Sequence, residues 1–310
     1  MEITRQALGD IFTGFKANFN SGFEGAESAY GDIAMTVPSS HKSEIYGWLG
    51  QVPKLREWIG DRVIKKLSSH SFSVTNKLFE DTISVQRTDI EDDNIGIYAP
   101  LFTDMGRAAK EKPDELVFAL LAQGFTSLCY DGQNFFDADH PVTNSDGETV
   151  TVSNMQAGNG PAWYLLDTSR AVRPLIYQER IAPKLTKLDN DEDQNVFFRD
   201  EYIYGVRARS NAGFGLWQLA FGSKAELNAE NYEAARQQMM KLKGDEGRLL
   251  GIKPNVLVTS PELEGAAMRL LNNGTRVVTV DNGGTPAVVS VQNEWAGTAK
   301  PIVTAWATAA

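Results

Sequence analysis

The residues best suited to chemistry lie in a short polar stretch near the middle of the chain. Asp137, Asp139 and His140 supply two carboxylates and one imidazole within four positions. Such groups can bind a divalent metal, and a carboxylate beside an imidazole can also move protons during hydrolysis. No further ligand stands at a spacing that completes a metal site, and an aspartate-stabilised turn before Pro141 explains the same residues. A hydrolase that uses Asp139 and His140 is therefore the weakest of the functional hypotheses.

A second acidic stretch matches part of a calcium-binding loop. Asp189, Asp191 and Asp193 occupy positions 1, 3 and 5 of that pattern, and Asp200 occupies position 12. The glycine required at position 6 is replaced by Gln194, and position 12 lacks the usual glutamate. We therefore favour a solvated acidic loop over a calcium site.

Several functional classes find no support in the sequence. Glycine-rich nucleotide motifs and the nucleophile elbow of hydrolases are absent. Cys129 is the single cysteine, so the chain forms no internal disulfide, and we expect this small side chain to be buried. The formal net charge of −10 opposes tight DNA wrapping as the main role. No apolar run approaches the ~18 residues of a membrane span, and the first residues do not resemble a signal peptide. We expect a non-enzymatic protein made in the cytoplasm, with no cofactor and no membrane partner.

The elements around these residues begin with a helix that has an unusual apolar face. Phe12, Phe15, Phe19 and Phe23 follow one another at spacings of three and four, which places four rings on one side. A short helix cannot bury such a face against itself. Two possibilities remain open, since the helix can pack on its own domain or contact a neighbouring subunit.

Alternating polar and apolar residues predict a long β-hairpin over Arg62–Leu67 and Ser71–Gln86. Its apolar positions include Phe72 and Val74, and its centre at Asn76–Asp81 is polar and typical of a turn. A hairpin that buries neither face is marginally stable by itself. We therefore expect it to lie on another surface.

The rest of the chain mixes helices and strands. Pro113 begins a helix with apolar residues on one face, and Thr103–Lys110 extends it upstream with a proline kink. A second helix begins after Asn228, and a third follows Ser260 and Pro261. Strands are predicted at 163–166, 197–208, 213–221, 255–259, 277–280, 287–291 and 302–305. No βαβ rhythm is sustained, which indicates the α+β class.

Several stretches, taken in order, resemble the major head subunit family of Mu-like phages. They are Ile11–Phe15 with Phe19, Tyr46–Gly50, Leu55–Gly60, Phe135–Pro141, Trp163–Asp167, Arg173–Ile176, Phe198–Val206 with Trp217, and Leu257–Glu264. The resemblance spans most of the chain and implies the HK97-type capsid fold, whose parts are an N-terminal arm, an E-loop, a P domain with a spine helix, and an A domain.

The resemblance also implies a division of the chain. The parts are an N-terminal arm at 1–43, a P domain with its spine helix at 44–61 and 91–130, an E-loop hairpin at 62–90, P-domain strands and loops at 131–221, and an A domain with C-terminal strands at 222–310. Contacts between subunits are then expected from Phe12, Phe15, Phe19 and Phe23 of the arm and from Phe72, Val74, Lys77 and Phe79 of the E-loop.

By the same resemblance, the chain assembles with itself into pentamers and hexamers of an icosahedral head. That head encloses double-stranded phage DNA through non-specific contact, and the subunit meets portal, scaffold and decoration proteins. Assembly takes place in the cytoplasm of the host bacterium, and the product is the virion. An encapsulin-like compartment shell is the alternative. On this view, Phe15→Asp, Phe19→Asp or deletion of Ser73–Asp81 leaves the subunit folded and blocks assembly.

Overall fold

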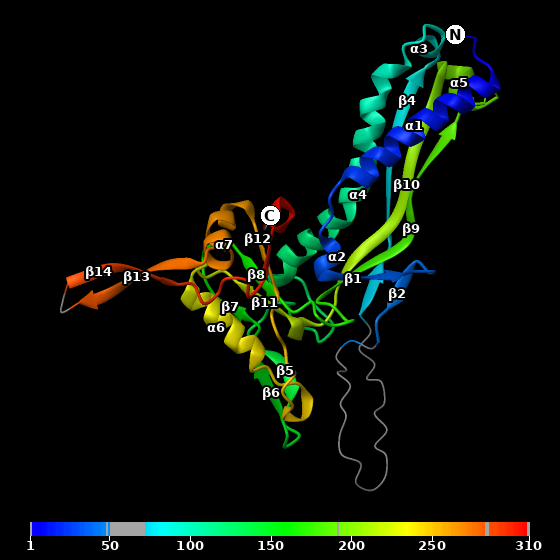
Figure 1. Cartoon of the computed structure of the whole chain (residues 1–310). Helices are drawn as coiled ribbons and strands as arrows, with labels where there is room; N and C mark the ends of the chain where they lie inside the picture. The colour runs from blue at the N-terminus through cyan, green and yellow to red at the C-terminus, as the bar shows by residue number, and fades with distance from the viewer. Residues whose placement is uncertain (1, 48, 50–71, 191, 283–284, 309–310) are drawn as a thin grey trace.

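The computed structural model describes residues 2–47, 49, 72–190, 192–282 and 285–308. These residues form an elongated lobe and a second, more compact body, each built around its own β-sheet (Figure 1). Helices and strands are mixed along the chain, so the predicted α+β class is confirmed.

The elongated lobe is built on a four-stranded sheet with the order β1-β9-β10-β4. Its strands are β1 (Ala34–Pro38), β9 (Leu175–Leu188), β10 (Glu201–Phe214) and β4 (Lys77–Gln86). β1 runs parallel to β9, whereas β10 pairs antiparallel with both β9 and β4. The long β9–β10 pair makes the lobe narrow and extended (Figure 1).

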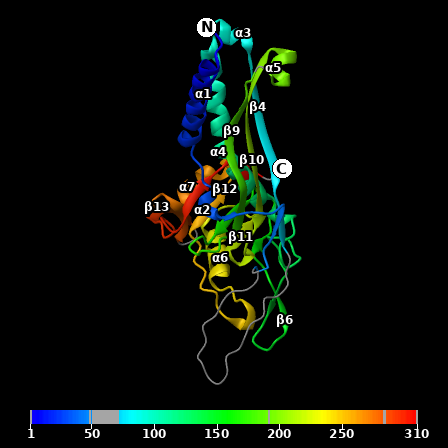
Figure 2. The same ribbon diagram turned by 90° about the vertical axis from the view of Figure 1, so that its right-hand side faces the viewer.

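Two long helices cover one side of this sheet (Figure 2). They are α1 (Arg5–Gly25) and α4 (Ala99–Ala122), and the short α3 (Arg87–Glu91) and η1 (Ile95–Tyr98) connect β4 to α4. Apolar residues of α1, α4 and the sheet bury one another in a separate core at this end of the molecule. The six-residue helix α5 (Gln194–Arg199) lies at the turn between β9 and β10.

The compact body is built on a five-stranded sheet with the order β15-β12-β8-β11-β7. Its strands are β15 (Lys300–Val303), β12 (Val256–Thr259), β8 (Trp163–Leu166), β11 (Ala220–Ser223) and β7 (Met155–Gln156). In each of the strands β8, β11 and β12, all four residues are buried, as expected for central strands. Helices α6 (Ala229–Met240) and α7 (Glu264–Leu271) pack against this body, which confirms the two helices predicted after Asn228 and Ser260.

The remaining elements are short. α2 (Tyr30–Ile33) precedes β1, and β2 (Ser43–Ile45) pairs with β3 (Ser73–Thr75). β5 (His140–Thr143) pairs with β6 (Thr149–Val152), and β13 (Thr275–Asn282) pairs with β14 (Thr285–Gln292). The β13–β14 hairpin extends away from the body (Figure 1). Single-turn 3₁₀ helices also occur at 123–125, 217–219, 245–247, 261–263 and 305–307.

Helix α4 connects the two cores. Phe102 and Met105 in its first half are buried in the core of the lobe, and Phe118 and Leu121 in its second half are buried in the core of the body. Pro113 lies inside the helix between the halves, and the helix extends upstream of it as predicted. β9 and β10 also contribute to both cores, so this helix and these two strands together join the lobe to the body.

The buried carboxylate of Asp114 fixes the chain that follows α1. It accepts hydrogen bonds from the Ser28 hydroxyl at 2.9 Å and from the backbone N–H groups of Ala29 and Tyr30 at 3.1 and 2.7 Å. These are the first N–H groups of α2, which have no acceptor within that helix. α4 thus holds both α1 and the segment that leads into β1.

Two glycines allow α1 and α4 to touch through their backbones. A Cβ atom on Gly106 of α4 would overlap the carbonyl oxygen of Phe19, and one on Gly22 of α1 would overlap the carbonyl oxygen of Thr103. Helices normally keep their axes 8–10 Å apart because of their side chains. The absence of a side chain at Gly22 and Gly106 lets the helices approach, so that Phe15 and Phe19 reach the core.

This contact predicts that Gly106→Ala destabilises the subunit. Alanine favours an isolated helix over glycine by roughly 1 kcal/mol, but the added methyl group forces α1 and α4 apart, so we expect a net loss of about 1–3 kcal/mol. Gly14→Ala is the matched control, because its Cβ would meet no atom within 4 Å. Urea unfolding of the unassembled subunit tests this. A Gly106→Ala variant as stable as Gly14→Ala would contradict the close contact.

Candidate assembly surfaces

The phenylalanine face of α1 packs on its own chain. Phe15 stacks on Phe102 of α4 with ring centroids 4.1 Å apart and meets Tyr204 of β10 edge-on at 5.2 Å. Phe19 is 4% exposed. Phe12 and Phe23 are half-buried; Phe12 stacks on Tyr204, and Phe23 stacks on Phe19. The helix therefore follows the first of the two possibilities that the sequence left open.

This burial changes what we expect of Phe15 and Phe19. Phe15 and Phe19 are not available to a neighbour in this structure, since both are 4% exposed. An aspartate at either position would place an unpaired charge in an apolar core, so the subunit itself would lose stability. The companion face on α4 is distant in sequence, and helical spacing in α1 could not reveal it. A contact between the rest of the arm and a neighbouring subunit stays a prediction.

The segment predicted as an E-loop hairpin is organised differently where the structure describes it. β4 runs without a break from Lys77 to Gln86 and pairs along its length with β10. The turn predicted at Asn76–Asp81 is therefore wrong, because β10 supplies a partner strand from much later in the chain. The other predicted arm, Arg62–Leu67, lies outside the described residues.

The four residues nominated in that segment fall in different environments. Val74 is buried beside Gly213 of β10, and Phe72 and Phe79 are half-buried. Lys77 is exposed. Deletion of Ser73–Asp81 would remove β3 and half of β4, so we now expect this deletion to destabilise the subunit itself.

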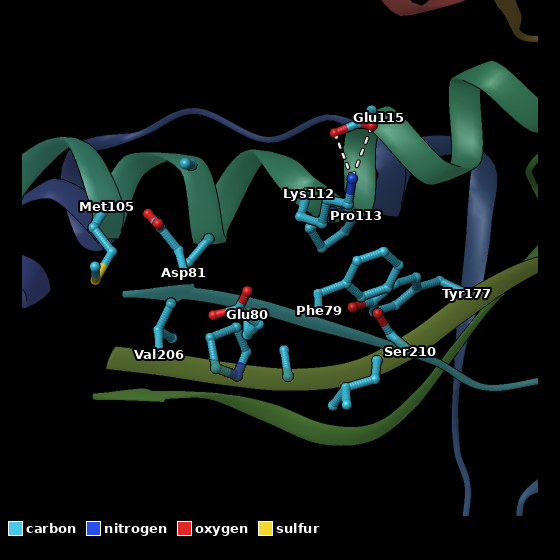
Figure 3. Close-up of a pocket in the computed structure, with 15 residues that line it drawn as sticks. Phe79, Glu80, Asp81, Met105, Lys112, Pro113, Glu115, Tyr177, Val206 and Ser210 are labelled. Carbon is cyan, nitrogen blue, oxygen red and sulfur yellow. Dashed lines mark hydrogen bonds and ion pairs between the residues drawn. The ribbon is translucent and has the colours of Figure 1, made fainter. Parts of the chain in front are cut away.

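A groove of about 530 Å³ runs between β4 and α4 (Figure 3). The Lys112 ammonium lies 4.8 Å from the centre of the Phe79 ring and bonds to the Glu115 carboxylate at 2.8 Å. Apolar side chains such as Met105 and Val206 form part of its lining. The groove is open and mixed in polarity, which suits a contact surface better than a buried small-molecule site.

The polar cluster with the most ordered geometry is centred on His140. Its Nδ1 lies 2.7 Å from Asp131 Oδ2, its Nε2 lies 3.2 Å from Asn154 Oδ1, and its ring stacks on Trp217 at 3.9 Å. The Cys129 thiol donates a hydrogen bond to Asp131 Oδ1 at 3.1 Å. Both ring nitrogens are engaged and the side chain is fully buried, so neither nitrogen is free to act as a general base.

The three residues nominated from the sequence, Asp137, Asp139 and His140, therefore do not form one cluster. Asp139 shares a hydrogen bond with Asp137, which raises the pKa of Asp139, while His140 points inward to other partners. The sequence did not nominate Asp131 or Asn154, whose side chains complete the cluster from nine and fourteen residues away.

Among the described residues, one group of three side chains is spaced for a metal ion: Cys129, Asp131 and His140, with ligand atoms within 4.8 Å of one another. Burial, followed by the neighbouring Asp131, raises the pKa of the Cys129 thiol above its ordinary value. A thiol in that state is a poor ligand, because metals bind the thiolate. Hydrogen bonds already satisfy all three groups, so the cluster acts as a structural brace for the loop between Cys129 and His140.

Comparison with known proteins identifies the family. The sequence profile described as Mu-like prophage major head subunit gpT matches residues 8–307. The chain belongs to this family. It is 45% identical over 290 residues to the Mu-like prophage FluMu major head subunit of Haemophilus influenzae, covering 90% of this chain and 94% of that protein. It is also 45% identical over 278 residues to the major capsid protein of Escherichia phage Mu, covering 88% of this chain and 91% of that protein.

Solved capsids show the same fold. A subunit from the procapsid of bacteriophage JBD30 superposes with a TM-score of 0.82 and 48% identity, covering 98% of this chain and 100% of that one. A subunit from the JBD30 capsid superposes with a TM-score of 0.73 and 36% identity, covering 91% of this chain and 92% of that one. The HK97-type capsid fold predicted from the sequence is confirmed, and the chain is a major capsid protein of a phage head, located in the virion.

The structure of this head subunit reveals a surface that the sequence did not predict. Phe197 and Phe198, expected to begin a strand, lie in α5, and the strand begins at Glu201. Both rings are largely exposed, at 77% and 76%. Val277 and Val288 of the β13–β14 hairpin are also exposed. Exposed apolar groups of this size are typical of contact surfaces.

The acidic stretch near α5 is only partly solvated. Asp189 is buried and forms an ion pair with Lys187 at 2.6 Å, which differs from the solvated loop expected there. Asp193 Oδ2 accepts a hydrogen bond from the Asn190 N–H, and Asp191 lies outside the described residues. In the part of the chain that is described, no helix is both long and apolar enough to span a bilayer.

The brace around His140 predicts an acid-sensitive stability difference. Burial alone would raise the pKa of Asp131, but hydrogen bonds from His140 and Cys129 outweigh burial and hold that pKa below its ordinary value. Stability from this carboxylate is therefore present above the unfolded pKa of about 3.9 and is lost as the pH falls through the lower folded pKa. We expect Asp131→Asn to cost about 3 kcal/mol at neutral pH.

The difference between wild type and Asp131→Asn should shrink as the pH falls from neutral to about 3, measured by urea unfolding. Asp146→Asn, at an exposed carboxyl in the turn between β5 and β6, is the control and should change stability little. A difference between wild type and Asp131→Asn that does not vary with pH would refute the role of this charge.

Proposed function

We propose that the chain assembles with itself into pentamers and hexamers that close an icosahedral head around double-stranded phage DNA. The observation that carries this proposal is the likeness to the JBD30 procapsid subunit over nearly the whole of both chains. A closed shell repeats one set of contacts many times, so individually weak contacts suffice. The net charge of −10 is consistent with DNA that is enclosed without specific binding.

The two-part architecture supports a domain assignment. The elongated lobe corresponds to the P domain, with α4 as its spine helix, and the compact body corresponds to the A domain. β7, β8 and β11 share a sheet with β12 and β15, so we assign residues 155–166 and 220–221 to the A domain in addition to 222–310. The E-loop remains assigned within 62–90, with β4 as the arm that returns into the lobe.

Several partners follow from this proposal. One JBD30 capsid is described as decorated with minor capsid protein trimers, and we propose a similar decoration here. A scaffold protein during assembly and a portal protein at one vertex complete the set expected for a phage head. We propose no catalytic activity, because the His140 cluster is buried and its hydrogen bonds are satisfied.

Electron microscopy of the purified chain, produced alone and with the scaffold protein of its phage, tests the proposal. We expect closed, round particles of uniform size, and DNA inside them after packaging. Monomers under every condition would contradict self-assembly. Particles that retain an enzyme cargo in place of DNA would instead favour the encapsulin-like compartment.

A further inference from the structure

The end of the elongated lobe carries an aromatic projection. α5 anchors itself through Val196, which is buried, and presents Phe197 and Phe198 to solvent with their rings edge-to-face at 5.1 Å. Arg199 follows them and is also exposed. We call Phe197, Phe198 and Arg199 the aromatic knob. Two adjacent rings this exposed are unfavourable in water, whereas aromatic and arginine side chains are the usual anchors of protein interfaces.

A groove of matching character lies at the same end of the lobe. It has a volume of about 420 Å³ and lies between α1 and the segment that contains η1. Ala7, Ile11 and Gly14 line it from α1, and Ile95 and Ala99 line it from the other side. Asp10 and Asp93 are exposed in its lining, which contains no basic residue. The groove is thus apolar with two carboxylates, and it complements two rings followed by an arginine.

The knob does not occupy the groove of its own chain. Both rings remain more than three-quarters exposed within the subunit. α1 and α5 also lie on opposite sides of the lobe (Figure 2). When two complementary surfaces lie on different sides of one molecule, each copy binds the next one head to tail. A row of copies joined in this way closes into a ring if the rotation between neighbouring copies permits it.

We propose that the aromatic knob of one subunit inserts into the α1–η1 groove of a second copy of this chain, with Arg199 facing Asp10 and Asp93. The proposal rests on the self-assembly proposed above and adds the surface that one subunit presents to the next. Because both surfaces lie at the end of the lobe, the contact joins lobe to lobe around an axis of the shell. It also gives the exposed rings of α5 an apolar environment.

A photoreactive residue identifies the neighbour of the knob. p-Benzoyl-phenylalanine replaces Phe198, and particles are assembled from a mixture of isotopically light and heavy subunits and irradiated. We expect cross-links between subunits to the tryptic peptides Gln6–Lys16 or Thr88–Arg107, which carry the groove. The same reagent at Leu188, exposed in the same lobe, is the control and should not label these peptides.

Other results overturn the inference without touching the proposed function. Particles that form but cross-link position 198 to another α5, to a different protein, or to nothing exclude the groove as its site. Failure of the unmodified chain to form particles would instead refute self-assembly.

Charge reversal covers the case in which the photoreactive variant does not assemble. Arg199→Glu and Asp10→Arg should each reduce particle yield by about tenfold, because like charges then face each other, and the double variant should recover most of the yield. Lys16→Glu, exposed on α1 outside the groove, is the control and should assemble normally. Single variants that assemble like wild type, or a double variant that is no better than either single one, would exclude the pairing.

Discussion

Close contact between the backbones of α1 and α4 determines how the elongated lobe is built. Gly22 and Gly106 leave no side chain between the helices, so α1 lies low enough for Phe15 and Phe19 to enter the core beside Phe102 and Tyr204. Apolar residues of the lobe sheet, such as Val85 and Leu185, are buried in the same core as these helices. Loss of the contact would expose that core, and the narrow lobe, one layer of helices on one sheet, could not persist.

Helix α4 connects this helix–helix contact to the rest of the molecule. Its second half lies in the core of the compact body, and its Asp114 holds the segment that leads from α1 into β1. The N-terminal helix, the lobe and the body are therefore one connected packing arrangement. Surfaces free for other subunits are then those outside this arrangement, such as the aromatic knob on α5, the groove beside η1 and the β13–β14 hairpin.

The sequence predicted elements whose signals are local and missed those that depend on distant partners. β12, Pro261 and α7 follow one another as predicted, although the Ser260 hydroxyl does not cap the helix. A turn was predicted over Lys77–Asp81 because these residues are polar, as is usual in an edge strand with both faces largely exposed. The partner strand β10 comes much later in the chain, so the local sequence did not reveal the pairing. At the His140 cluster, adjacent Asp139 was nominated, whereas Asp131 and Asn154 approach through loop folding. The family resemblance supplied the fold that periodicity alone could not.

On this structure, α1 belongs to the core of its own subunit before any shell exists. Hydrogen–deuterium exchange of the unassembled subunit, followed over Arg5–Gly25, tests it most directly. The structure predicts that the amides of the second half of α1, which face α4, are protected to the same degree as those of Phe102–Gly106. Exchange of α1 at the rate of an unstructured chain in the free subunit, with protection gained only on assembly, would contradict it.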